Sequence, residues 1–269
     1  MADPSLTPTF PPNIDADSHV VVAFSGGLDT SFTVLYLRRE YGCTVTTVTV
    51  DTGGFDAEET EQIAARSAEL GAVGHHHVDG RQAVYDEHLS WLIRGNILRG
   101  AVYPLCVGAE RVVQAREVAR VANEVGASCI VHGSTGAGND QVRFEVAIAA
   151  LAPEIDTWAP IRDMNVRRAQ SAAYLGEHGF PVDASVKDYS INAGLWGVTI
   201  GGKETHNPWQ YPPEKAWPTT VNPAEAPAEG TEVVIGFEQG LPITLNGQAL
   251  PPLELLESAR AIAAAHGVG

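Results

Sequence analysis

Residues 20–31 constrain the fold of this chain more than any other stretch. They run Val-Val-Val-Ala-Phe-Ser-Gly-Gly-Leu-Asp-Thr-Ser, an apolar β-branched segment followed by small residues. Near-continuous apolar runs are typical of strands that are buried on both faces of a parallel sheet. Gly26 and Gly27 let the backbone turn sharply and approach a ligand closely. We therefore expect a strand over 19–24, a tight turn, and a helix from Leu28 whose first amide groups point back at the turn, a geometry that binds anions.

This turn lacks the residues of the two common nucleotide-binding loops. No Lys follows Gly27, as a P-loop would require, and the dinucleotide pattern G-x-G-x-x-G is absent. A phosphate held here would rely on backbone amides, on the hydroxyls of Ser25, Thr30 and Ser31, and on a bound metal ion. The pattern S-G-G-x-D-[ST]-S resembles the pyrophosphate loop of the N-type ATP pyrophosphatases. The alternative is a glycine-rich β–α turn that binds no ligand.

Composition narrows the classes of partner and the compartment. The net charge of −16 disfavours a nucleic acid or an anionic membrane as the main partner. The three cysteines have no metal-like spacing, and we expect them to be reduced core residues. The sequence shows no signal peptide and no apolar run approaching about 18 residues. These features predict a soluble, cytoplasmic protein.

Strand-like and helix-like segments alternate along the first part of the chain, which predicts an α/β fold with a doubly wound parallel sheet. We expect a Pro-rich disordered arm over 1–17, a nucleotide-binding domain over 18–165 and a smaller substrate-binding α+β domain over 166–269. The expected strands are 44–50, 72–78, 128–132 and 157–161. The expected helices are 28–41, 57–70, 84–98, 109–125, 142–151, 166–177 and 253–265. Residues 187–197 are interpreted as a loop, 205–230 as a wrapping segment, and 231–247 as a small antiparallel unit.

A run of three histidines, His75 to His77, falls in the third predicted strand. Neighbouring side chains of a strand point to opposite faces, so the three cannot bind one metal ion together. We interpret them as a polar strand end and predict no protein metal site.

A second glycine-rich turn, residues 133–141, follows the strand over 128–132 and precedes another helix. Because the carboxyl ends of parallel strands meet at one edge of a sheet, we expect the two glycine-rich turns to lie side by side. Asp140 would accept an ammonium group, Thr135 and Asn139 would bind a carboxylate, and Arg143 offers a bidentate fork. This set would recognise an amino acid. The alternative is a plain helix cap made by Asn139 or Asp140.

Together these blocks resemble the argininosuccinate synthase family, and the resemblance runs from about residue 20 to residue 269. It is carried by the segment 23–31, by Tyr103-Pro104-Leu105, by the segment 133–145, and by Tyr189-Ser190 with Leu195. The resemblance implies the fold of the adenine-nucleotide α-hydrolases and an AMP-forming ligase of arginine biosynthesis that uses ATP and Mg²⁺. The ureido oxygen of citrulline would attack the α-phosphorus of ATP and release pyrophosphate. The amine of aspartate would then displace AMP to give argininosuccinate.

The resemblance also implies which residues bind each substrate. For ATP they are Ala23, Phe24, Ser25, Gly26, Gly27, Leu28, Asp29, Thr30, Ser31 and Gly133. For aspartate they are Thr135, Asn139 and Asp140. For citrulline they are Tyr103, Asn139, Arg143, Ser190 and Thr199. The residues expected to contribute most to catalysis are Asp29, Asp140 and Arg111, through positioning and charge neutralisation.

The sequence departs from the family pattern at several positions. Ala137 stands where a Lys is common, Gly108 removes a hydroxyl expected near citrulline, and Thr199 replaces a Ser. Family members usually continue further, and that extension carries a Glu and a Tyr for citrulline and an oligomerisation helix. Two alternatives stay open. One is a related ligase that joins aspartate to another acceptor, and the other is a non-catalytic nucleotide-binding subunit. A homo-oligomer or a complementing chain is compatible with either.

Overall fold

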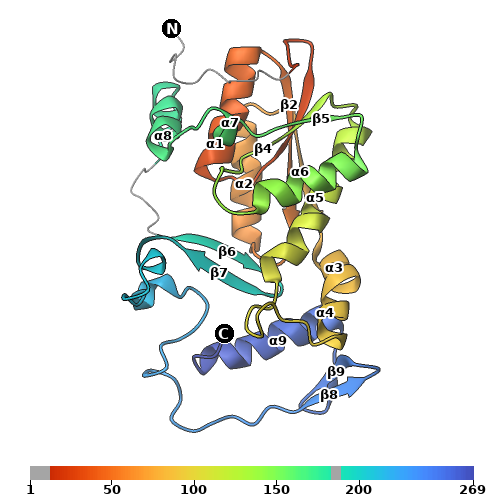
Figure 1. Ribbon diagram of the computed structural model, residues 1–269, viewed down its shortest axis with the longest axis vertical. Helices are drawn as coiled ribbons and strands as arrows, with labels where there is room; N and C mark the ends of the chain where they lie inside the picture. The colour runs from red at the N-terminus through yellow and green to blue at the C-terminus, as the bar shows by residue number, and fades with distance from the viewer. Residues whose placement is uncertain (1–12, 183–188) are drawn as a thin grey trace. The chain divides into compact units, whose positions relative to one another are not determined.

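The computed structural model describes residues 13–182 and 189–269, which form two compact units. The first unit comprises residues 13–51, 55–80 and 111–182 and is built on a parallel sheet with the order β3-β2-β1-β4-β5 (Figure 1). The strands are β1 (His19–Ala23), β2 (Thr44–Asp51), β3 (Gly74–Asp79), β4 (Cys129–His132) and β5 (Asp156–Trp158). Strand order reverses direction at β1 and β4, so a ligand is expected outside their carboxyl ends. The predicted doubly wound sheet is confirmed.

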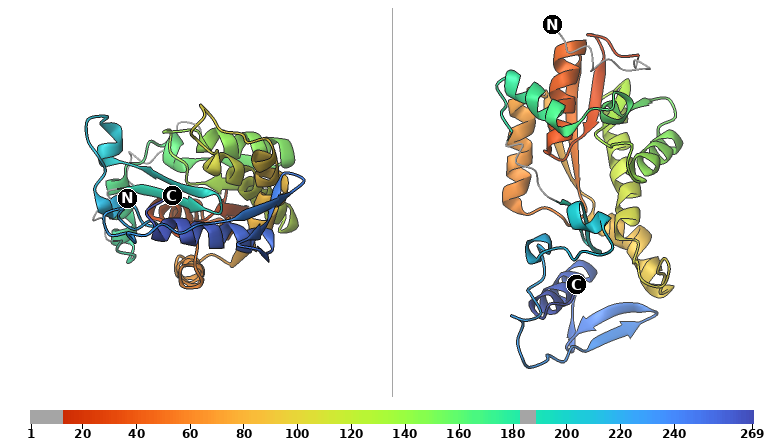
Figure 2. Two further views of the ribbon diagram at one scale, coloured as in Figure 1. Left: turned by 90° about the horizontal axis from the view of Figure 1, so that it is seen from below. Right: turned by 60° about the vertical axis from the view of Figure 1, so that its left-hand side comes forward.

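Helices cover both faces of this sheet because β1 sends alternate side chains to opposite sides. Val20 and Val22 belong to one core cluster with Phe32 of α1, whereas Val21 belongs to a second cluster with Ala119 of α5. Figure 2 shows the sheet between the two helix layers. The helices are α1 (Leu28–Tyr36), α2 (Ala57–Glu69), α5 (Cys106–Glu124, in this unit from residue 111), α6 (Asp140–Leu151), α7 (Pro160–Asp163) and α8 (Arg168–Glu177).

Local chemistry fixes where the first two helices begin and end. α1 continues as a π-helical turn, η2 (Leu37–Tyr41), and stops at Gly42, whose φ of 72° favours glycine. α2 begins with a capping box, in which the Asp56 carboxylate accepts from the Glu59 amide at 2.8 Å and the Glu59 carboxylate accepts from the Asp56 amide at 3.1 Å. Both helices therefore end or start where the sequence predicted.

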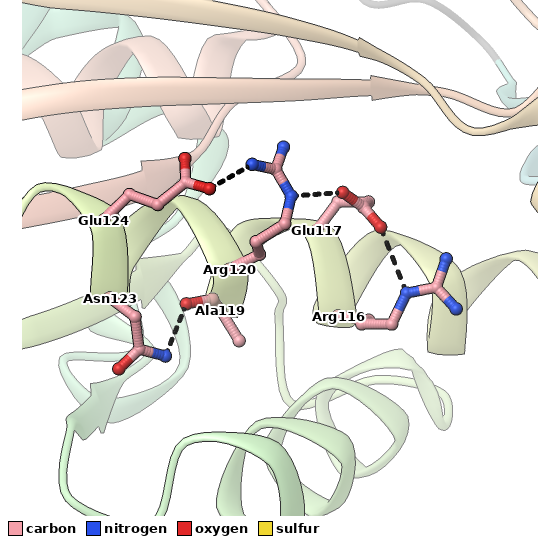
Figure 3. Close-up of polar contacts among 6 residues, drawn as sticks. All are labelled: Arg116, Glu117, Ala119, Arg120, Asn123 and Glu124. Carbon is pink, nitrogen blue, oxygen red and sulfur yellow. Dashed lines mark hydrogen bonds and ion pairs between the residues drawn. The ribbon is translucent and has the colours of Figure 1, made fainter.

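A chain of ion pairs runs along α5 (Figure 3). The carboxylate of Glu117 pairs with Arg116 Nε at 3.0 Å and with Arg120 Nε at 2.8 Å, and Arg120 Nη1 reaches Glu124 at 2.6 Å. An exposed pair at helical spacing, such as Arg120 with Glu124, stabilises by only about 0.3–0.5 kcal/mol. The cluster therefore supports the helix surface and contributes little to the fold as a whole.

The second unit comprises residues 52–54, 81–110 and 189–269. The single helix expected over 84–98 is divided into α3 (Arg81–Val84), the π-helical η3 (Tyr85–Leu89) and α4 (Ser90–Arg94). The expected antiparallel unit is present as β8 (Ile235–Glu238), β9 (Leu241–Leu245) and β10 (Gln248–Ala249), with α9 (Pro252–Ala265) in contact with β9. Short 3-10 turns, η4 (Lys203–His206) and η5 (Glu214–Ala216), occur before it.

Residues 190–201 form an antiparallel hairpin, so the interpretation of 187–197 as a loop is wrong for its described part. β6 (Ser190–Gly194) and β7 (Gly197–Gly201) pair with Ile191 opposite Ile200 and Ala193 opposite Val198. These apolar residues alternate with polar residues and glycines, as the two faces of a strand require. The high glycine content hid this alternation in the sequence. Residues 187 and 188 lie outside the described residues.

Two further boundaries differ from the expectations. Residues 1–12 of the predicted arm lie outside the described residues, but Ile14 is buried in the first core cluster and the Ser18 hydroxyl donates to Asp15 at 2.8 Å. The boundary expected after residue 165 does not match the division into units, because Tyr174 of α8 packs edge-on against Phe32 of α1. Across the described ranges, no helix combines the length and apolar character needed to cross a membrane.

Candidate functional site

The two glycine-rich turns lie side by side at the same edge of the sheet. β1 and β4 pair in parallel with Ala23 opposite His132, so the turn 24–27 and the turn 133–139 leave the sheet at neighbouring positions. The second turn also packs against the start of α1, which the first turn leads into, because a Cβ placed on Gly133 would lie 2.9 Å from Cγ2 of Thr30. The prediction that the two turns lie together is therefore confirmed.

The first turn is shaped to present backbone amides. Gly26 has a φ of 71°, and Gly27 precedes the helix in an extended conformation. The Thr30 hydroxyl donates to the Gly27 carbonyl at 3.3 Å and lies 3.3 Å from the Ser25 hydroxyl. The first amides of α1 have no acceptor within the helix and point out of its N-terminus. Such a turn can hold phosphate oxygens by amide and hydroxyl donors without a Lys.

Three of the predicted ATP residues, Phe24, Thr30 and Ser31, have buried side chains. Ser31 is 1% exposed, and its hydroxyl lies within hydrogen-bonding distance of the Gly26 carbonyl and of Arg66 Nε, 3.4 Å each. Phe24 is also buried, with its ring edge-on to His75. The side chains of Phe24 and Ser31 pack beneath the turn, so only the backbone of these two residues could reach a nucleotide, whereas the Thr30 hydroxyl lies at the turn beside Ser25. Their assignment to ATP binding stays a prediction.

Asp29 is the carboxylate of the first turn and is half-buried. Burial raises its pKa above the ordinary value, while Arg168 and Ser171 of α8 act in the opposite direction. A carboxylate at a helix N-terminus is otherwise favoured by the helix dipole.

The histidine run lies on the edge strand β3. His75 Nδ1 lies 2.8 Å from the Thr47 hydroxyl on β2, which gives this ring a partner within the sheet. Among residues 13–182 and 189–269 no group of three or more His, Cys, Asp and Glu side chains is placed to hold a metal ion.

The second turn presents exposed polar groups. Thr135 and Asn139 are exposed, and Asn139 precedes α6 without a capping hydrogen bond from its side chain. The alternative in which Asn139 caps the helix is therefore not observed. The Ala137 amide donates to the Thr135 hydroxyl at 3.3 Å. The side chain of Asn139 does not cap the helix.

Asp140 sits between two arginines. One carboxylate oxygen accepts from Arg143 Nη1 at 2.8 Å, and the other lies 3.2 Å from Arg111 Nε. Arg111, whose side chain is 12% exposed, also donates to Gln114 at 2.8 Å. Asp140 therefore orients two guanidinium groups and keeps lone pairs for a further donor. The sequence analysis put Asp140 and Arg143 in one turn and assigned Arg111 to catalysis, but it did not predict that the three side chains pair.

The hairpin of the second unit carries the other predicted residues. Opposite and alternate positions of an antiparallel pair share a face, so Ser190, Thr199 and Asn192 lie on one side. Asn192 stands directly opposite Thr199 and was missed by sequence reasoning. Its spacing of two from Ser190 would have indicated it, had 190–194 been predicted as a strand.

The start of α5 packs over the same hairpin face near its turn. A Cβ on Gly194 would overlap the Glu110 carboxylate, and one on Gly197 would lie 3.8 Å from Cys106 Sγ. Cys106 Sγ in turn donates to the Tyr103 hydroxyl at 3.7 Å. Tyr103 is thereby linked through Cys106 to the hairpin that bears Ser190 and Thr199.

Comparison with known proteins bears on this arrangement. The model of the arginosuccinate synthase N-terminal HUP domain matches residues 19–181, and that of the arginosuccinate synthase C-terminal domain matches residues 189–269. The chain belongs to the argininosuccinate synthase family. Its first unit is accordingly a HUP-type α/β domain, and the antiparallel strands with α9 belong to the smaller C-terminal domain.

Individual relatives agree with this assignment. The argininosuccinate synthase of Methanocaldococcus jannaschii is 40% identical over 250 residues, which is 93% of this chain and 62% of the relative. Those of Pyrobaculum aerophilum and Synechococcus sp. are 39% and 40% identical, and the matches cover 94% and 93% of this chain. The chain spans about 62–63% of the length of these relatives.

Proposed function

We propose that this chain takes part in the AMP-forming ligation of citrulline with aspartate to give argininosuccinate. The observation that carries the proposal is the contact between the two glycine-rich turns, with Gly133 against Thr30. This contact supports the proposal because it brings the turn proposed to bind phosphate next to the turn proposed to bind an amino acid. The family membership of the chain supports the same reaction.

In the proposed reaction the first turn binds the triphosphate of ATP. The amides that open α1 and the hydroxyls of Ser25 and Thr30 would hold the pyrophosphate as it leaves the α-phosphorus. Mg²⁺ keeps several waters and binds chiefly through phosphate oxygens and one or two carboxylates. Asp29 is the only carboxylate in this turn, so the donor set fits a metal ion held mainly by the nucleotide.

The second turn would hold aspartate while its amine displaces AMP. Thr135 and Asn139 are exposed donors for its carboxylates, and Asp140 would accept from its ammonium group. Because Asp140 already fixes Arg143 and Arg111, its carboxylate would orient these guanidiniums toward anionic groups of the reactants. Citrulline is assigned to Tyr103, Asn139, Arg143, Ser190 and Thr199 on the strength of the family resemblance.

A pyrophosphate-release assay with aspartate fixed and the acceptor varied tests this proposal. Release that depends on citrulline, with argininosuccinate formed when aspartate is present, is the expected result. Release only with another acceptor would assign the chain to a different ligase. Binding of ATP without turnover under any acceptor would contradict catalysis by this chain and favour a nucleotide-binding subunit.

Asp140→Ala tests the role of the second turn. We expect nearly unchanged ATP affinity and the loss of aspartate-dependent turnover, because the carboxylate lies in the amino-acid turn. Glu117→Ala is the matched control, since Glu117 also bridges two arginines, on α5 (Figure 3). Equal losses of ATP affinity and turnover in Asp140→Ala, or the same losses in Glu117→Ala, would refute the assigned role.

A further inference from the structure

Arg162 lies on α7 and is not among the predicted site residues. Its guanidinium contacts three neighbouring side chains. Its Nε donates to Asp163 at 2.6 Å, and its Nη1 reaches Glu145 at 2.5 Å and Gln141 at 3.3 Å. Glu145 and Gln141 both belong to α6, the helix that follows the second glycine-rich turn. One guanidinium therefore ties α7 to the first turns of α6.

Gln141 extends this connection to the backbone of the turn. While its side-chain oxygen accepts from Arg162, its side-chain nitrogen donates to the Gly136 carbonyl at 3.1 Å. Gly136 also lies against Arg162 directly, because a Cβ there would be 3.7 Å from Arg162 Cγ. The centre of the turn is thus fixed between Thr135 and Asn139, the two exposed donors of the proposed amino-acid site.

An ion pair with a part-buried carboxylate keeps the guanidinium in place. Glu145 lies 3.7 Å from Nε2 of His132, which is 2% exposed, and forms its closer pair with Arg162. His132 and Arg162 hold the pKa of Glu145 below its usual value, so the carboxylate is ionised at neutral pH. A lysine could keep the charge but not the planar fork that meets Glu145, Gln141 and Asp163 together.

We propose that Arg162 is a positioning residue that shapes the turn 133–139 through Gln141 and thereby sets Thr135 and Asn139 for an amino-acid substrate. The inference rests on the proposed function in naming that substrate. The bracing of the turn itself is independent of it. Arg162 contacts no predicted ligand group and acts on the site through Gln141 and Gly136.

A double-mutant cycle on the full chain tests this role with Arg162→Lys, Gln141→Leu and both changes together. Aspartate binding is measured by calorimetry in the presence of a non-hydrolysable ATP analogue, and analogue binding is measured separately. We expect each single change to weaken aspartate binding about tenfold, the order expected for one lost hydrogen bond to a charged group. The double variant should be no weaker than either single one, and analogue affinity should stay within about twofold of the unmodified chain.

Amide hydrogen exchange over residues 135–138 gives a second measurement that needs no substrate. Arg162→Lys and Gln141→Leu should both speed exchange there, because the turn loses its brace. Arg120→Lys is the matched control, since Arg120 also makes two ion pairs, on the α5 surface (Figure 3), and should change neither binding nor exchange in the turn.

Several outcomes would overturn the inference. Additive losses in the double variant would mean that Arg162 does not act through Gln141. Equal losses of analogue and aspartate affinity would indicate general destabilisation. Unchanged exchange over 135–138 would contradict the brace directly. If the unmodified chain binds no aspartate, the proposed function fails, and faster exchange in both variants would still support the positioning role.

Discussion

Replacing Gly133 by alanine should press the second turn against the first. The added Cβ would lie 2.9 Å from Cγ2 of Thr30, whereas carbon atoms pack best at about 3.5–4.0 Å. Thr30 is 8% exposed, and its hydroxyl is tied to the Gly27 carbonyl, so rotating the side chain would break that bond. Overpacking of this kind costs about 1–3 kcal/mol of unfolding free energy. The displaced helix start should also weaken ATP binding.

Thr30→Ser offers a specific rescue because it removes Cγ2 and keeps the hydroxyl. Alone it should cost about 0.8 kcal/mol, the value of one buried methyl-sized group. In Gly133→Ala/Thr30→Ser the clash is absent, so the double variant should be about as stable as Thr30→Ser. Urea unfolding of the four proteins, followed in parallel with ATP binding, measures both the stability and the affinity.

Three results would contradict the predicted packing of Gly133 against Thr30. If the two changes are additive, Gly133 does not meet the Thr30 methyl group. If Gly133→Ala lies within about 0.5 kcal/mol of the unmodified chain, the turns are not in contact, since surface substitutions typically stay inside that range. Lost ATP affinity with unchanged stability would mean that the added methyl group disturbs ATP binding directly and does not overpack against Thr30.

Three further predictions concern stability. Burial raises the pKa of Asp29, so the folded state binds this proton more tightly than the unfolded state does. The stabilisation that results is present at low pH and is lost as pH rises through the folded-state pKa. The unfolding free energy of Asp29→Asn, relative to that of the unmodified chain, should therefore rise between about pH 3 and pH 7. Denaturant unfolding at the two pH values measures this difference, and a difference that does not change would mean that Asp29 is not desolvated. Gly176→Ala in α8 meets no atom within 4 Å and should stabilise by about 0.5–1 kcal/mol, seen as a higher melting temperature; a lower one would indicate an unseen clash. Asp56→Ala removes one side of the α2 capping box and should cost about 1 kcal/mol in urea unfolding, whereas Asp56→Asn should retain most of that stability.

Most of the first unit could be predicted from local patterns. β1 is a run of valines, Gly42 and Gly71 stop helices, and glycine-rich turns follow β1 and β4, so periodicity and turn chemistry agree. The hairpin 190–201 was missed because Gly194, Gly197 and Gly201 dilute its alternation, and glycine has low strand propensity. Pairing between β6 and β7 across the turn at 195–196 decided its conformation.

The sequence alone determined which chemical groups are available and where the chain turns, because backbone preferences of Gly26 or Gly42 act over a few residues. Tertiary structure decided what each group does with its neighbours. Asp140 meets Arg111 from α5, and Arg162 reaches Gln141 across twenty-one positions of sequence. Such pairings depend on how the helices are placed around the sheet, and that is set by the burial of apolar side chains along the whole first unit.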